Sequence, residues 1–316
     1  MSYDVVIAVL TFRRPGPLDH LLPVLIAQVQ ASEERTSVLV IDNDPDGSAS
    51  STVERYATEA VRYVNEKRPG IAAARNRALD EAGGARMLIF IDDDEIPHPG
   101  WLPAIVGTYR GAGEPAAVVG PVVSDFDRPP DPWVAAGDFF RRRRLPTGTE
   151  VTVAATNNLL LDLGAIDGWG LRFDEKFGMS GGSDTLFTRS IHARGGRMVW
   201  CDEAVVTDQV PAERVTRRWV LLRALRSGNS WARVGLHLAP SVGGRWRVRA
   251  AMVGQGAPRL LGGLGRAALG VLARSPAAQA KGLRTAARGA GMVTGAFGYT
   301  YAEYRRRKSL SAHGPR

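Results

Sequence analysis

The sequence is poor in cysteine, in long apolar runs and, over its last third, in acidic residues. Its single cysteine, Cys201, excludes an intrachain disulfide and fits a reducing compartment. No uncharged apolar stretch reaches the ~18 residues that a membrane-spanning helix needs. No basic segment followed by an apolar one precedes the first strand-like run, so we expect no signal peptide. These shortages predict a cytoplasmic protein without a membrane span.

Two nucleotide-binding motifs are missing as well. No Gly-x-Gly-x-x-Gly follows the first expected strand, and no Gly-x-x-x-x-Gly-Lys-Ser/Thr occurs anywhere in the chain. Both absences disfavour a dinucleotide-binding fold and a P-loop enzyme.

The acidic residues are unevenly distributed. From Arg214 to the C-terminus the chain holds 20 lysines or arginines and one acid, Glu303, whereas residues 1–213 hold 21 basic and 31 acidic residues. The shift predicts a globular domain over residues 1–212 and a basic helical region over residues 213–316. A uniformly basic nucleic-acid-binding protein would not show this split, although the net charge of +9 leaves nucleic-acid binding as an alternative.

Strand-like and helix-like segments alternate along the first hundred residues. We expect strands at 4–10, 37–41, 61–64 and 87–91, and helices at 17–30, 52–60 and 71–82. Alternation of this kind predicts an α/β fold with a parallel sheet and right-handed crossovers. Further along we expect helices at 99–109 and 183–194, strands at 116–123, 156–161 and 200–207, and an irregular segment at 125–150.

The most informative stretch is Met87 to Glu95, in which five apolar residues run into four carboxylates. The apolar run predicts a strand buried on both faces, and the acids then lie at its carboxyl end, where open α/β sheets bind ligands. Adjacent carboxylates repel one another, so a hard divalent cation with oxygen ligands is expected nearby. A solvated acidic turn is the alternative that this stretch alone leaves open.

Five short motifs follow one another in a recognisable order. They are Thr11-Phe12-Arg13-Arg14-Pro15 after the first strand, Asp42 after the second, Gly70 to Asn76 at a helix entry, Asp92 to Asp94, and Gly181 to Leu186 followed by Arg189. Together they resemble a family 2 glycosyltransferase with the GT-A fold, of the bacterial exopolysaccharide type found in succinoglycan assembly. The third motif resembles the family's Gly-x-x-x-Ala-Arg-Asn and the fourth its Asp-x-Asp. Ser183 departs from the Glu-Asp pair common in the family at that place.

The resemblance implies an inverting transfer of a sugar from a nucleotide-diphosphate donor to a hydroxyl of a saccharide or lipid-linked acceptor, in cell-surface polysaccharide or glycolipid synthesis. It makes Asp184 the general base, and it makes Asp94 and Asp92 ligands of Mn²⁺ or Mg²⁺, with Asp208 as a further candidate. The implied donor-binding residues are Thr11, Arg13, Asp42, Arg75, Asp92 and Asp93. The implied acceptor-binding residues are Asn157, Gly182, Ser183 and Trp200.

Several of these residues have a plainer interpretation. Asp42 is equally typical of a turn cap, Arg75 of an exposed ion pair, and Asp184 of an N-terminal helix cap. Alternation along an extended segment would turn the Asp93 side chain away from the metal. Arg141 to Arg144 fit either a charged acceptor or a solvated loop. Among enzymes, a nucleotidyltransferase on a related fold is the alternative.

The basic region carries a helical pattern. From Thr216 on, apolar residues recur at helical spacing between arginines, as with Trp219, Leu222 and Leu225. Basic amphipathic helices bind the interface of anionic membranes. We therefore expect a peripheral enzyme on the inner face of the plasma membrane, with helices that pack only on the catalytic domain as the alternative.

Overall fold

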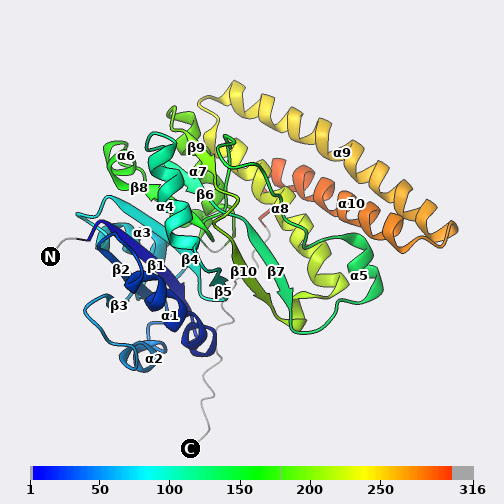
Figure 1. The fold of residues 1–316 in the computed structure, drawn as a ribbon. Coiled ribbons are helices and arrows are strands. Elements are labelled where there is room, and N and C mark those ends of the chain that lie inside the picture. Colours follow the sequence, from blue (N-terminus) through cyan, green and yellow to red (C-terminus); the bar gives the residue numbers. More distant parts are fainter. Residues whose placement is uncertain (1–2, 179, 301–316) are drawn as a thin grey trace, which may run out of the picture.

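The first part of the chain builds the parallel half of a seven-stranded sheet (Figure 1). In the computed structural model, which describes residues 3–178 and 180–300, four strands run parallel in the order β3-β2-β1-β4. They are β1 (Val5–Thr11), β2 (Thr36–Asp42), β3 (Val61–Asn65) and β4 (Met87–Asp92), joined by the helices α1 (Pro15–Gln30), α2 (Ser50–Glu54) and α3 (Ile71–Glu81). The predicted alternation and α/β class are confirmed.

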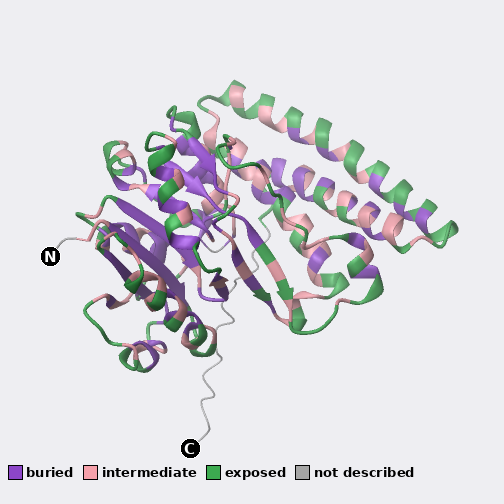
Figure 2. Cartoon of the chain, viewed as in Figure 1, coloured by how far each residue is buried: buried purple, intermediate pink, exposed green. Residues whose placement is uncertain are grey.

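Strand β1 shows how the sheet is buried on both faces. Its odd-numbered apolar residues pack with α1 and α4 (Trp101–Gly111), and its even-numbered ones pack with α3 and α7 (Ser183–Ala193). Period-two alternation sends successive side chains to opposite faces, so a run such as Val5 to Leu10 has to be apolar throughout. Figure 2 shows these central strands as buried. The result is a three-layer domain whose strand ends are the accessible edge.

The second half of the sheet is mixed in direction. Strand β8 (Leu159–Asp162) lies antiparallel to both β4 and β6 (Ala117–Val119), and β9 (Met198–Trp200) completes the sheet parallel to β6. A separate three-stranded sheet has the order β5-β10-β7, formed by β5 (Glu95–Pro97), β10 (Val206–Val210) and β7 (Val122–Phe126). The remaining short helices are α5 (Pro132–Gly137), α6 (Leu163–Gly168), and the 3₁₀ turns η1 (Glu175–Phe177) and η2 (Ala212–Arg214).

Several predicted boundaries are wrong. Helix α2 ends at Glu54 rather than at residue 60, because Arg55 and Tyr56 turn to bind Asp19 of α1 through their side chains. The expected strand over 200–207 is two strands in two different sheets, and the expected strand over 156–161 begins only at Leu159. The segment 125–150 contains α5, whose first turn is capped by the side chain of Asp131.

The C-terminal region consists of three long helices. They are α8 (Arg217–Leu238), α9 (Val242–Leu272) and α10 (Pro276–Ala296), and α9 and α10 form an antiparallel hairpin that projects from the part of the molecule built around the sheets (Figure 1). Within residues 3–300 apart from 179, no helix is long and apolar enough to cross a membrane. The division into residues 1–212 and 213–316 stays a prediction, and its part beyond residue 300 lies outside the described residues.

Glycines at seven-residue spacing let the hairpin helices approach closely. Gly256, Gly263 and Gly270 of α9 face α10, which contributes Gly282 and Gly289. A Cβ atom on Gly263 would lie 2.7 Å from the carbonyl oxygen of Gly282, and the reverse substitution gives the same distance. Backbone therefore packs against backbone along this seam, as small residues allow.

Candidate active site

The acidic run forms a tight turn at the carboxyl end of β4. Asp92 ends the strand, Asp93 and Asp94 make the turn, and Glu95 begins β5. The buried Glu95 carboxylate accepts a hydrogen bond from the backbone N–H of Asp92 at 3.2 Å and another from the Asn157 amide at 2.6 Å. Asn157, expected on the acceptor side, thus holds the turn through Glu95. Sequence reasoning gave Glu95 no role, although it is the residue that closes the turn.

Strand β10 brings a further acid to this turn. It pairs antiparallel with β5, and Asp208 lies directly opposite Glu95 in the register. Asp208 is therefore inside a strand rather than at a strand end, and it is mostly buried. Four acidic side chains from β4, the turn after it, β5 and β10 consequently share one region: Asp92, Asp94, Glu95 and Asp208. We call these four residues the acid cluster.

Three arginines from distant segments surround the acid cluster. Arg14 donates to Asp93 at 2.7 Å and to Asp94 at 2.9 Å, and Arg214 donates to the same Asp94 oxygen at 3.1 Å. Arg142 donates to Asp208 at 2.5 Å. Sequence reasoning expected a cation here but missed these residues. Arg14 stood inside the first motif and Arg142 inside the arginine run, so both signals were present.

The pKa values of four carboxyl groups in this region are raised because several acids lie close together and are buried away from water. Burial, reinforced by the charge of Asp94, raises the pKa of Asp92 to about 6. Burial raises the pKa of Asp93 to about 7, although Arg14 and the Thr11 hydroxyl oppose the shift. Burial also raises the pKa of Asp208, and it holds the pKa of Glu95 well above its usual range. An additional cation would relieve this crowding.

The acid cluster suits a hard divalent cation that is shared with a ligand. Carboxylate oxygens are the donors that Mg²⁺ and Mn²⁺ prefer, and Asp92 receives no hydrogen bond on its carboxylate from any residue that the structure describes. No three His, Cys, Asp or Glu side chains among the described residues are placed to hold one ion. Mg²⁺ is commonly held by one or two carboxylates together with phosphate oxygens. The acid cluster therefore fits a metal ion that is held by one or two of its carboxylates together with a diphosphate.

The ends of β1 and β2 hold the next predicted residues. The Thr11 hydroxyl donates to Asp93 at 2.7 Å, so the Asp93 side chain points towards β1. The exposed Arg13 binds Asp44 and Asp46 at 3.1 and 3.0 Å. The fully buried Asp42 carboxylate accepts hydrogen bonds from two backbone N–H groups, those of Asp44 and Ala49, and from the hydroxyl of Tyr63. In the structure, Asp42 thus has the turn-capping contacts; its part in donor binding stays a prediction.

Helices α3 and α7 meet beside the acid cluster. The buried Arg75 of α3 donates to the Ser183 hydroxyl of α7 at 2.8 Å, and its positive charge acts on Asp92 by lowering the pKa of that group. Asp184 follows in the first turn of α7 and is half-buried; one of its oxygens accepts the N–H of Thr185 at 2.8 Å. Arg75, which is predicted to bind the donor, thus contacts Ser183, which is predicted to bind the acceptor.

The residues before and after α7 have different surroundings. Gly182 has a φ of 96°, a conformation that glycine adopts without strain, and a Cβ there would lie 3.1 Å from Ser230 of α8. Trp200 is buried in the sheet, where its indole N–H donates to Asp202 and the guanidinium of Arg143 lies 5.5 Å from the ring centroid. Gly182 therefore lies next to Ser183 at the start of α7, whereas Trp200 lies in the core. Their roles in acceptor binding stay predictions.

Comparisons with known proteins agree with this geometry. Residues 6–167 match the family described as Glycosyl transferase family 2. The succinoglycan biosynthesis protein ExoM of Rhizobium meliloti (strain 1021) is 34% identical over 245 residues, which cover 77% of this chain and 78% of that protein.

Solved structures show a similar fold. The mannosyltransferase PcManGT from Pyrobaculum calidifontis, in complex with GDP-Man and Mn²⁺, has a TM-score of 0.57 at 19% identity, over 91% of this chain and 86% of that one. TarS 1–349 from S. aureus, in complex with UDP-GlcNAc, has a TM-score of 0.52 at 15% identity, over 89% and 90%. The chain belongs to the family 2 glycosyltransferases, and its catalytic part has the GT-A fold.

Proposed function

We propose that this glycosyltransferase transfers a sugar, with inversion at the anomeric carbon, from a nucleotide-diphosphate donor to a hydroxyl of a saccharide or lipid-linked acceptor in cell-surface polysaccharide synthesis. The observation that carries the proposal is the Arg75–Ser183 hydrogen bond. It joins Ser183, the residue before Asp184, to Arg75, whose positive charge acts on Asp92 of the acid cluster. The complexes of PcManGT with GDP-Man and of TarS with UDP-GlcNAc support a nucleotide-sugar donor.

On the donor side, Asp92 and Asp94 would hold the metal together with the donor's diphosphate. A bound Mn²⁺ or Mg²⁺ would neutralise the charge that develops on the departing diphosphate. Arg14 and Arg214 already lie within hydrogen-bond distance of Asp94, so they are positioned to donate to diphosphate oxygens brought there. Thr11, Arg13, Asp42, Arg75 and Asp93 complete the proposed donor side. Asp208, with its partner Arg142, is proposed as a further metal ligand.

On the acceptor side, Asp184 would take the proton from the acceptor hydroxyl as that oxygen attacks the anomeric carbon. Its first oxygen accepts the Thr185 N–H, and its second oxygen, which receives no hydrogen bond from any described residue, would take this proton. Gly181 and Gly182 have φ values of 78° and 96° and carry no side chain, so an acceptor can approach closely. A single displacement of this kind inverts the configuration and forms no covalent intermediate.

A thermal-shift screen and two substitutions test the proposal. Nucleotide sugars should raise the melting temperature, and the donor should do so more strongly with Mn²⁺. Asp184→Asn should abolish transfer while the Mn²⁺-dependent shift persists, whereas Asp94→Asn should remove both. The exposed Asp127→Asn serves as the matched control and should leave both unchanged. Near-normal turnover by Asp184→Asn would exclude it as the base.

We further infer that α9 binds the surface of an anionic membrane, on the cytoplasmic leaflet. Large apolar side chains are exposed along this helix, at Val242, Trp246, Leu261, Leu264, Leu269, Val271 and Leu272. From residue 250 to 273, its only charged side chains are Arg259 and Arg266. Apolar side chains flanked by arginines match the interface of an anionic bilayer.

Vesicle sedimentation tests the membrane inference. The protein should pellet with vesicles that contain anionic lipid and much less with purely zwitterionic ones. Leu261→Ser combined with Leu269→Ser should weaken pelleting by about tenfold or more, because each replaces an exposed leucine that would enter the bilayer. Equal pelleting of this variant and the parent protein would contradict the inference.

A further inference from the structure

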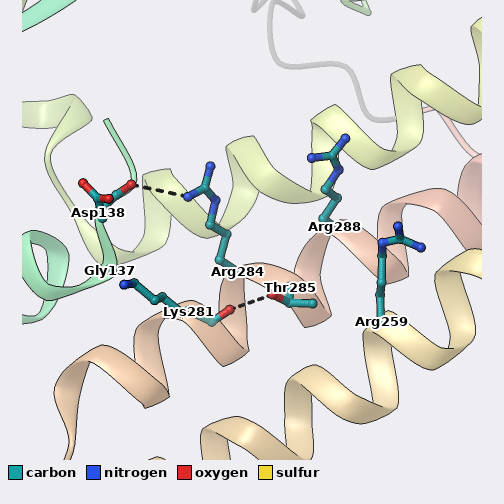
Figure 3. A pocket seen from close by; sticks show the side chains of 7 residues that line it. All are labelled: Gly137, Asp138, Arg259, Lys281, Arg284, Thr285 and Arg288. Carbon is teal, nitrogen blue, oxygen red and sulfur yellow. Dashed lines mark hydrogen bonds between the residues drawn. The ribbon is translucent and has the colours of Figure 1, made fainter. Parts of the chain in front are cut away.

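A cationic pocket lies between α5 and the α9–α10 hairpin (Figure 3). It encloses about 310 Å³ and shares no residue with the acid cluster. Its lining consists of Gly137 and Asp138 at the end of α5, Arg259 from α9, and Lys281, Arg284, Thr285 and Arg288 from α10. Four of these seven residues are cations from two different helices.

The four cations have no acidic partner among residues 3–178 and 180–300. Among the described residues, none of Arg259, Lys281, Arg284 and Arg288 forms an ion pair with a carboxylate. Arg284 donates to the backbone oxygen of Asp138 at 3.4 Å, and Arg259 donates to a backbone oxygen of its own helix at 2.8 Å. The Asp138 carboxylate lies 3.8 Å from Arg141, which is not part of the lining. Asp138 is the one acid of this lining, so the pocket keeps an excess of positive charge within the described part of the chain.

Helical spacing makes this charge unfavourable without a ligand. Lys281, Arg284 and Arg288 follow one another at intervals of three and four residues, which places them on one face of α10, where like charges repel. Figure 3 shows the guanidinium groups of Arg284 and Arg288 extending on the same side of that helix. Burial, together with the charges of Arg259 and Arg284, holds the pKa of Arg288 below its usual range. An anion in the pocket would remove this repulsion.

The pocket's wall is joined to the active site by a short segment. Asp138 lines the pocket, and four residues later Arg142 binds Asp208 of the acid cluster. Four extended residues span at most about 14 Å, so the Cα atoms of Asp138 and Arg142 are no further apart than that. Trp133 of α5 also donates to Gln279 of α10 at 2.9 Å, which ties the wall to the hairpin. An anion held here would lie close to the segment that carries Arg142.

We propose that this pocket binds the phosphate or diphosphate group that links a sugar acceptor to its lipid anchor. Guanidinium forks match phosphate oxygens in pairs, and clustered cations favour a multiply charged group over a single carboxylate. The volume suits one or two phosphate groups, and the exposed apolar side chains of α9 would receive the lipid. The assignment rests on the proposed lipid-linked acceptor, and it adds the residues that recognise the lipid-proximal phosphate.

Protection of Lys281 from acetylation tests the pocket directly in the full-length protein. An amine-reactive ester is applied with and without inorganic pyrophosphate, and the rate at each lysine is read by mass spectrometry. Bound pyrophosphate should slow acetylation of Lys281, while the exposed Lys176 of η1 reacts at an unchanged rate. Arg284→Gln combined with Arg288→Gln should weaken the protection by about tenfold or more, because charge-assisted hydrogen bonds are lost.

The matched control removes the same charge elsewhere. Arg245→Gln combined with Arg247→Gln alters exposed arginines of α9 outside the pocket and should leave the protection of Lys281 intact. Phosphatidylcholine vesicles that contain a long-chain alkyl diphosphate should protect Lys281, and vesicles of phosphatidylcholine alone should not. Protection by phosphatidate vesicles without protection by the alkyl diphosphate would overturn the acceptor assignment in favour of a bilayer headgroup.

Two further results would overturn the pocket itself. One is a Lys281 rate that pyrophosphate does not change; the other is protection that both double variants lose equally. Because acetylation is read without sugar transfer, the outcome is separate from the proposed reaction. Protection in a protein that transfers no sugar would leave the pocket standing, and transfer to a lipid-linked acceptor without protection would remove it.

Discussion

The acid cluster and the α9–α10 hairpin handle charge and packing in opposite ways. At the acid cluster, Asp94 and Asp208 are matched by arginines that come from positions 14, 142 and 214. Along the hairpin, the arginines have few acids to meet, and glycines bring the two backbones together instead. The catalytic part thus pairs much of its buried charge internally, whereas the hairpin packs backbone against backbone and presents its cations outward. Charge is therefore largely paired within the chain in the first region and left facing outward in the second.

The largest expected effect concerns the packing of the hairpin. Gly263→Ala places a Cβ atom 2.7 Å from the Gly282 carbonyl oxygen, so the helices must separate, and the free energy of unfolding should fall by about 2 kcal/mol or more. The neighbouring Gly262→Ala meets nothing within 4 Å, and alanine's higher helix propensity should raise stability there by up to about 1 kcal/mol. Chemical denaturation of both variants measures the opposite signs. Two changes of the same sign would show that the close seam is absent.

The second effect concerns the buried charge of the acid cluster. Because burial raises the pKa of Asp93 to about 7, above the model-peptide value of roughly 4, the folded state binds more protons than the unfolded state between these pH values. The contribution of Asp93 to stability is then full below about pH 4 and is lost as the pH rises through 7. Relative to the parent protein, Asp93→Asn should therefore gain stability between pH 5 and pH 8, on the order of a few kcal/mol.

Denaturation curves of both proteins across this pH range, without divalent cations, measure the change. Asp127→Asn, on an exposed loop, is the matched control and should run parallel to the parent protein. A constant difference between Asp93→Asn and the parent protein would contradict the raised pKa of Asp93.

These regions also differ in how far the sequence predicted them. Strands β1 to β4 were predictable because each apolar run is local and its period is visible in the sequence. The pairing of Asp94 with Arg14 and Arg214 was not, because these arginines are 80 and 120 residues away from it along the chain, even though Arg14 lies within the first motif. The close packing of α9 against α10 was not predicted. Glycine is unfavourable inside a helix, and its seven-residue spacing becomes informative only when the partner helix is known. Local patterns thus predicted the elements, and long-range pairing supplied the site.

We expect the smallest effect on stability at Arg13. This residue also best separates charge that pairs within the chain from charge that binds a ligand. Its side chain is 59% exposed and binds Asp44 and Asp46, and exposed ion pairs of this kind contribute little to stability. Arg13→Gln should therefore leave the melting temperature nearly unchanged. If Arg13 binds the donor as proposed, the KM for the nucleotide sugar should rise by about tenfold while kcat changes little, since the loss falls on binding common to ground and transition states. Arg35→Gln, which removes a similarly exposed arginine paired with Asp4 at the far end of β1, should change neither quantity. An unchanged KM in Arg13→Gln would assign this arginine to the surface ion pairs alone and leave donor recognition to Arg14, Arg75 and Arg214.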